Sequence, residues 1–139
     1  MSSWMGVARA SKVRSCPPEA ILDGCDRKVV ALVNRIRALI QDMIDGVSEV
    51  GDPAGRRIRF RRRGDFAFVQ PMEDHVRLGF EYGAALPNFG GVLEGDGKRV
   101  RHLTIRSSRA VTSMGVKTLL SAALFDDDTH GFRRRAAKR

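Results

Sequence analysis

Polar side chains of several chemical types are concentrated between residues 75 and 102 of this 139-residue chain. Within the run LEGDGKRVRH, carboxylates, an ammonium group, guanidinium groups and an imidazole lie close together. Such a set can hold a small polar ligand through hydrogen bonds, and imidazole with carboxylate can bind a metal ion. The glycines of the run would also let backbone N–H groups approach an anion. The candidate ligand-binding residues are His75, Arg77, Glu94, Lys98, Arg101 and His102.

The same run also permits a purely structural interpretation. It can form a tight turn that leads into a strand, with Glu94 paired to Lys98 or Arg101. It is not a phosphate-binding P-loop, because the first glycine of that motif and the hydroxyl residue after the lysine are absent. His75 and His102 can share a ligand only if their strands are neighbours, and both also suit a solvated sheet face.

A row of arginines defines a second candidate surface. In RRIRFRRR the apolar Ile58 and Phe60 alternate with basic residues, as expected for a strand with one face in the core. The basic row could contact a phosphate backbone, or it could protect an edge strand from pairing with another chain. The candidate nucleic-acid-binding residues are Arg57, Arg59, Arg61 and Arg63. We expect no aromatic residue beside them, because Phe66 and Phe68 are predicted to face the core.

The sequence contains no recognised catalytic motif. It has neither a Gly-x-Ser-x-Gly elbow nor a His-Glu-x-x-His sequence, and no catalytic residue is assigned. Cys16 and Cys25 are expected to be reduced thiols near the N-terminus, and a redox pair is the alternative. We therefore expect a binding protein, and an enzyme of an unrecognised type is a third hypothesis.

Hydrophobic periodicity assigns these polar residues to predicted elements. Apolar residues at spacings of three and four indicate a helix from residue 26 to about residue 45, capped by Asp23 or Asp26. A second helix is expected to begin near Thr112 or Ser113. Between the helices, residues with a period of two indicate strands at 56–63, 66–71, 75–82 and 99–107.

The order helix, four strands, helix predicts an α+β fold. We expect an antiparallel sheet of about four strands, flanked on one face by an N-terminal and a C-terminal helix. The predicted segments are a disordered N-terminal segment at 1–19, the α+β domain at 20–128 and a basic C-terminal tail at 129–139. A pocket exists only if the glycine-rich segment before the fourth strand, and that strand itself, fold back beside the other strands.

The net charge of +9 is concentrated near the two ends of the chain. The region from 20 to 131 is nearly balanced, so the total charge by itself does not indicate a nucleic-acid interface. No apolar run reaches the roughly 20 residues needed to cross a bilayer, and the N-terminus lacks the apolar region of a secretory signal. We therefore expect a cytoplasmic protein without a membrane partner, whose oligomeric state the sequence does not indicate.

Three short motifs stand close together between residues 75 and 105. They are His-Val-x-Leu-Gly-Phe, Gly-Ala-x-Leu-Pro, and Leu-Glu-Gly-x-Gly-Lys followed by a basic strand with Arg-His. Their positions here are His75, Val76, Leu78, Gly79, Phe80, Gly83, Ala84, Leu86, Pro87, Leu93, Glu94, Gly95, Gly97, Lys98, Arg101 and His102. In these motifs, and in outline over about 20–125, the chain resembles the YdhG-like family. One departure is the segment GDPAGRRIRFRRRGD, where that family usually has a tryptophan or tyrosine with Gly-x-Pro.

The resemblance implies a small bacterial domain of unknown function, grouped loosely with frataxin and the YjbR proteins. Some members are described as frataxin-like iron chaperones, so iron is the cofactor that the resemblance suggests. Iron carriage of that kind uses exposed carboxylates, and the one acidic cluster in this sequence is 126–128. The leading hypothesis is an intracellular binding domain for a metal or a small polar ligand. The alternative is a nucleic-acid-binding accessory protein that uses Arg57 to Arg63 and the C-terminal tail.

Overall fold

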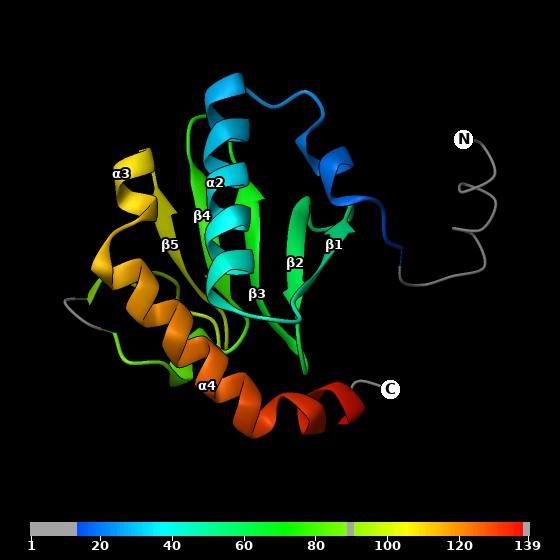
Figure 1. The fold of residues 1–139 in the computed structure, drawn as a ribbon, viewed down its shortest axis with the longest axis vertical. Coiled ribbons are helices and arrows are strands. Elements are labelled where there is room, and N and C mark those ends of the chain that lie inside the picture. Colours follow the sequence, from blue (N-terminus) through cyan, green and yellow to red (C-terminus); the bar gives the residue numbers. More distant parts are fainter. Residues whose placement is uncertain (1–13, 89–90, 138–139) are drawn as a thin grey trace.

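An antiparallel sheet with helices on one face forms the described part of the protein (Figure 1). The computed structural model describes residues 14–88 and 91–137. The strands are β1 (Ser48–Asp52), β2 (Arg57–Arg61), β3 (Asp65–Pro71), β4 (Val76–Phe80) and β5 (Arg101–Ile105). The helices are α2 (Arg27–Met43), α3 (Ser108–Val111) and α4 (Met114–Ala137), with short 3-10 helices η1 (Pro18–Leu22) and η2 (Gly83–Ala85). The predicted α+β architecture is confirmed.

Helix α2 forms because its apolar residues recur on one side. Val29, Val33 and Ile36 are at most 1% exposed and pack in the core between the helix and the sheet. Asp26 caps the helix, since its carboxylate accepts the Lys28 N–H at 3.0 Å. The predicted helix and one of its two predicted caps are therefore confirmed.

The five strands follow one another in chain order across the sheet, each antiparallel to the next. Strand β1 was not predicted, because SEVGD lies among glycine, aspartate and proline and has too little alternating hydrophobicity. Strand β5 pairs with β4 although a long loop separates them. The glycine-rich segment and the last predicted strand thus fold back beside the other strands, as a pocket there requires.

A β-bulge in the pairing of β2 with β3 separates two phenylalanines that were predicted to share the core face. The register shifts after Phe60, which pairs with Ala67. Phe66 joins the core cluster, whereas Phe68 lies outside that cluster on the opposite face of the sheet. The prediction for Phe68 was wrong because a period of two does not reveal an extra residue in one strand.

Helix α4 packs across the end of the sheet and continues to Ala137 (Figure 1). Ser113, one of the two predicted starts, precedes the first residue of α4 and caps the helix. Its hydroxyl accepts the Val116 N–H at 3.3 Å. Residues 129–137, which the sequence assigned to a separate basic tail, belong to this helix, and 138–139 lie outside the described residues. Within the described ranges, no helix is long and apolar enough to cross a membrane.

The described part of the predicted N-terminal segment, 14–19, contacts the edge of the sheet. Cys16 exchanges two backbone hydrogen bonds of 3.0 Å with Gly51 of β1. Glu19 pairs with Arg37 of α2 at 3.1 Å. Cys16 thus extends the pairing of β1 at the edge of the sheet, and residues 1–13 lie outside the described residues.

A buried carboxylate joins α4 to the turn between β2 and β3. Asp127 is 2% exposed and accepts the backbone N–H groups of Arg63 at 3.0 Å and Gly64 at 2.9 Å. The two backbones approach so closely that a Cβ on Gly64 would lie 2.8 Å from the Gly131 carbonyl oxygen. Because the ionised acceptor satisfies both donors, this contact holds the helix over the turn.

We predict that Asp127→Ala lowers the free energy of unfolding by about 3 kcal/mol, because two backbone donors lose a charged acceptor. Asp128→Ala is the matched control. It removes a more exposed ion pair with Arg62 and Arg63 and should cost less than about 1 kcal/mol. Urea denaturation of both variants measures the difference, and equal losses would contradict the role assigned to Asp127.

Candidate ligand-binding site

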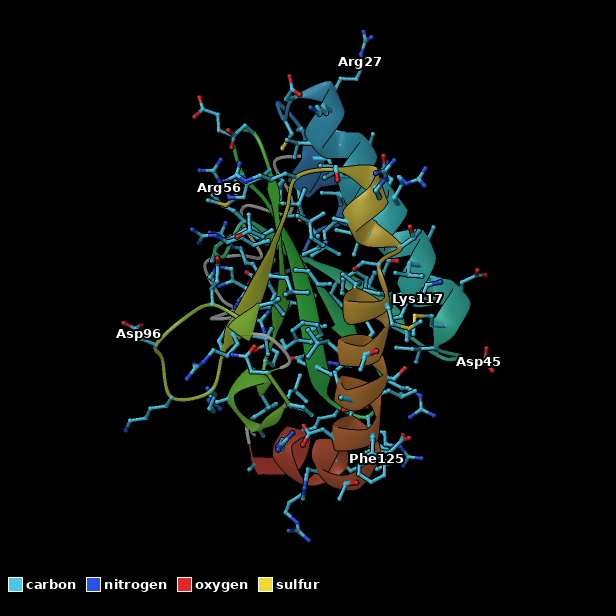
Figure 2. The ribbon with its side chains drawn as sticks, turned by 90° about the vertical axis from the view of Figure 1, so that its left-hand side faces the viewer. Arg27, Asp45, Arg56, Asp96, Lys117 and Phe125 are labelled. Carbon is cyan, nitrogen blue, oxygen red and sulfur yellow. The ribbon has the colours of Figure 1, made fainter. Side chains whose placement is uncertain are left out.

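The sheet face opposite the helices, here called the outer face, collects four of the six predicted ligand-binding residues. In Figure 2 the helices lie on one side of the sheet and the loop that carries Asp96 on the other. Across β4 and β5, Arg77 lies opposite Thr104 and Gly79 lies opposite His102. Because side chains alternate along a strand, these positions and His75 share the outer face.

Glu94 attaches the loop before β5 to the outer face. Its backbone forms a bridge with His102, with N–H to carbonyl distances of 2.8 and 2.9 Å. Its carboxylate Oε1 lies 3.2 Å from His102 Nε2 and accepts the Thr104 hydroxyl at 2.9 Å. The pairing of Glu94 with Lys98 or Arg101, which the sequence left open, is replaced by contacts with His102 and Thr104.

The His102 imidazole is surrounded by groups that act on its charge. Burial lowers its pKa below the ordinary value, the nearby Arg77 guanidinium lowers it further, and Glu94 opposes both effects. His75 also lowers it slightly, and its own ring lies 2.7 Å from the Asp74 carboxylate. The two imidazoles therefore stand on one face and close enough to interact electrostatically.

Arg77 differs from its neighbours because its half-buried guanidinium has no hydrogen bond or ion pair with any residue in 14–88 or 91–137. The positive charge of Arg77 lies near His102 and lowers the pKa of that imidazole. A half-buried cation without a counter-ion is costly, and an incoming anion would supply one. Arg77 is therefore the strongest anion-binding group of this face.

The two remaining predicted residues lie apart from this cluster. Lys98 is exposed at the end of its loop. Arg101 lies opposite Phe80, on the core side of the register, and donates to the backbone carbonyls of Gly97 at 2.6 Å and Val100 at 2.8 Å. Its guanidinium thus stabilises the loop before β5 and is not available to a ligand on the outer face.

The predicted arginine row is largely neutralised by carboxylates. Three of its members lie on the outer face and form ion pairs there. Asp52 pairs with Arg57 at 3.1 Å and with Arg59 at 3.2 Å. Asp65 pairs with Arg59 at 3.5 Å and with Arg61 at 2.9 Å. Glu81, 8% exposed, adds a carboxylate oxygen 3.6 Å from Arg59. Arg63 lies elsewhere, since it binds Asp128 at 3.0 Å and stacks on Phe132 of α4.

Phe68 is the aromatic residue that we did not expect on this face. Its ring covers Gly79, the cross-strand partner, so closely that a Cβ on Gly79 would lie 2.1 Å from it. The Arg57 guanidinium lies 4.6 Å from the ring centroid, within cation–π distance. Phe68 is thus 5% exposed although it stands outside the core, and it forms an apolar floor beside His102.

The residues described do not form the ligand set that iron would need. Within 14–88 and 91–137, no three histidine, cysteine, aspartate or glutamate side chains gather as a metal site. The acidic cluster at 126–128 is engaged in protein contacts, because Asp126 pairs with Arg134, Asp127 binds the β2–β3 turn and Asp128 pairs with Arg62 and Arg63. The iron that the resemblance suggests therefore does not fit this arrangement.

Sequence reasoning missed two contributors to the site. Thr104 could have been found, because it follows His102 by two positions on the same strand and must share its face. Phe68 could not have been found from alternation, since the bulge decides its side. Comparison of the chain with protein-family models, curated proteins and solved structures gave no match, so the site is interpreted from its own geometry.

We predict that His102 makes the protein less stable as the pH falls. The unfolded chain takes up a proton near the ordinary imidazole pKa of about 6.5, whereas the folded protein does so only at lower pH, so the unfolded state binds more protons in that window. Unfolding free energies at pH 7.5 and at pH values below about 6.5 should show this loss in the wild type and a smaller loss in His102→Gln. Lys98→Gln, on the exposed loop, should keep the wild-type profile, and an unchanged profile in His102→Gln would contradict the assignment.

Proposed function

We propose that this protein is a non-enzymatic binding domain that takes a small anionic ligand on its outer face, at a site formed by His75, Arg77, Glu94 and His102. The observation that supports the proposal most is the unpaired guanidinium of Arg77 on a face where the other outer arginines have carboxylate partners. A carboxylate or phosphate group can accept two parallel hydrogen bonds from such a guanidinium.

The neighbours of Arg77 complement this role. His102 is held largely neutral by burial and by Arg77, so an anion that binds between them would raise the pKa of His102 and favour a second charge-assisted hydrogen bond. The Thr104 hydroxyl already donates to Glu94, and the Glu94 carboxylate faces His102. Glu94 thereby orients the imidazole, and binding should strengthen as the pH falls through the range in which His102 gains its proton.

We also propose that the chain is a YdhG-like, frataxin-related domain that works in the cytoplasm. Support for the family comes from the motif glycines, which have structural reasons here. Gly79 has no room for a side chain beneath Phe68, a Cβ on Gly83 would lie 2.5 Å from the Cβ of Arg101, and Gly95 has a φ of +121°. The motifs thus specify how β4, the loop and β5 fit together.

The alternative function, a nucleic-acid-binding accessory role, is favoured by one observation. Arg61 and Asp65 line one hollow of about 60 Å³ together with the end of α4, so the arginine strand lies beside the basic C-terminal segment. Tyr82 lies in the same hollow, with the Arg134 guanidinium 3.6 Å from its ring centroid. Basic and aromatic groups together are typical of surfaces that bind single-stranded or duplex polyanions.

The proposed anion site is tested with inorganic phosphate as the probe. In thermal-shift titrations at constant ionic strength, phosphate should bind Arg77→Gln about tenfold more weakly than the wild type, as expected for a lost charge-assisted hydrogen bond. Arg109→Gln, an exposed arginine of α3, is the matched control and corrects for the general stabilisation by phosphate. Equal phosphate shifts in all three proteins would remove the site.

The alternative is tested separately by fluorescence anisotropy with a labelled DNA duplex. Binding should decline steeply as salt is raised, and reversing the charges of Arg134 and Arg135 to glutamate should weaken it. The same reversal at Arg27 and Lys28, two exposed cations at the start of α2, is the control. Absence of binding at low salt, or equal loss in both double variants, would rule this function out.

A further inference from the structure

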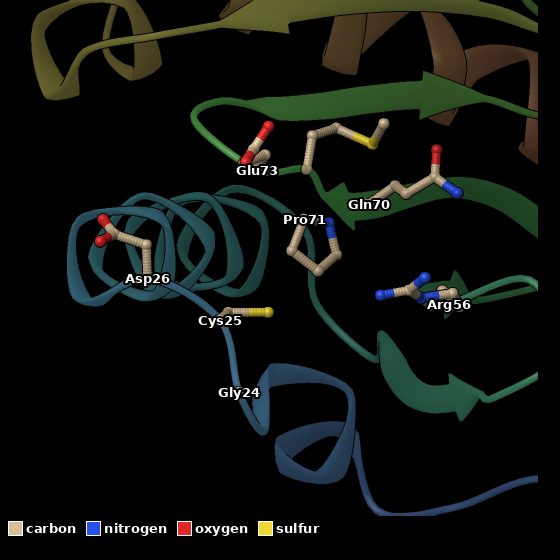
Figure 3. Close-up of a pocket in the computed structure, with 8 residues that line it drawn as sticks. Gly24, Cys25, Asp26, Arg56, Gln70, Pro71 and Glu73 are labelled. Carbon is tan, nitrogen blue, oxygen red and sulfur yellow. The ribbon is translucent and has the colours of Figure 1, made fainter.

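Two adjoining hollows lie at the end of the sheet near the start of α2, and Figure 3 shows residues that line the larger one. Their volumes are about 740 and 370 Å³, within the range of small-molecule sites. They share four lining residues, which are Gly24, Cys25, Arg56 and Pro71. The walls come from the link between η1 and α2, from the β1–β2 turn and from the end of β3.

The smaller hollow has more apolar than polar surface. Besides the shared residues it is lined by Cys16, Ala20, Ile21, Asp23 and Pro53. Cys25 contributes a thiol whose weak hydrogen bond goes to the Ile21 carbonyl at 3.7 Å. A hydrocarbon group could therefore leave water there without covering a buried polar group.

Arg56 lies at the junction of the two hollows. It is the one positively charged residue among the residues that line them. In Figure 3 its guanidinium and the Cys25 sulfur point toward each other from opposite walls, below Pro71. Within residues 14–88 and 91–137, the guanidinium has no hydrogen bond or ion pair. It is thus free to bind an anionic group that enters the junction.

The backbone at Arg56 adds a second observation. Its φ is +53°, and it is the one non-glycine residue with positive φ among the described residues. The turn is held by the Asp52 carboxylate, which accepts the Gly55 N–H at 3.1 Å, and by Gln70, which donates to the Gly55 carbonyl at 2.9 Å. A glycine would adopt the conformation of Arg56 at lower cost, so the arginine side chain stands at this position at a cost in backbone strain.

We propose that this junction binds a small monocarboxylic acid with an apolar body. The carboxylate pairs with Arg56 and the apolar body occupies the smaller hollow. The linings also contain three carboxylates, Asp23, Asp26 and Glu73, which repel ligands with several negative charges. They repel a single carboxylate less than a polyphosphate, which separates this site from the phosphate-binding site proposed at Arg77.

The test uses hexanoate and its neutral analogue hexanamide as probes, observed by two-dimensional ¹⁵N–¹H NMR of the full chain. Hexanoate should shift the amide signals of Gly24, Cys25 and the β1–β2 turn in a saturable way, and hexanamide should bind roughly tenfold more weakly. Arg56→Gly should weaken hexanoate binding to the same extent without lowering the melting temperature, because glycine accepts the positive φ. Arg56→Asn is a second variant, since asparagine also tolerates this conformation.

The matched control is Arg27→Gln, an exposed arginine of α2 outside both linings, which should bind hexanoate like the wild type. Three results would overturn the proposal: no saturable shift in the wild type, equal affinity for hexanoate and hexanamide, or unchanged affinity in Arg56→Gly. Saturable shifts confined to His75, Arg77 and His102 would place the carboxylate on the outer face instead. Amide shifts at Gly24, Cys25 and the β1–β2 turn report binding at the junction, and shifts at Arg77 and His102 report binding on the outer face, so the two sites are tested independently.

Discussion

The antiparallel pairing of β5 with β4 is the interaction on which the fold and the outer face depend. It places Leu103 and Ile105 in the core, and by alternation it places His102 and Thr104 beside Arg77. The backbone bridge between Glu94 and His102 extends the pairing by one step and brings the loop onto the same surface. The register of β5 against β4 sets the side chains on both faces of the sheet at once. It therefore brings together residues that are distant in sequence.

Local patterns in the sequence were enough to predict α2, with Asp26 as one of two candidate caps, and four of the strands, whereas the shared face of His75 and His102 depended on strand pairing that the patterns do not give. They were not enough wherever a long-range contact decides the structure. Strand β1 exists because it pairs with β2, Phe68 faces outward because of a bulge, and residues 129–137 stay helical where Asp127 and Arg134 anchor them. Counter-ions of the arginines were equally hidden, since Asp52 and Asp65 reach them only through strand pairing.

Positive charge in this chain is common, and most of the arginines on the outer face are paired with carboxylates. Carboxylates from neighbouring strands balance Arg57, Arg59 and Arg61, which rigidifies the outer face and reduces its long-range field. Arg77 and Arg56 differ from them because packing leaves each without a partner. Ligand recognition is therefore expected where the protein has not already satisfied its own charges, and not where arginines are most numerous.

The fit of the Phe68 ring over Gly79 makes these two positions a single steric unit across β3 and β4. A larger residue at position 79 would require a smaller one at position 68, because the ring leaves no space for a side chain there. The size of the residue at position 79 is therefore set by its aromatic cover. A sequence that keeps this glycine but has a small residue in place of the ring would leave a gap in the middle of the sheet, and its outer face would have a different shape.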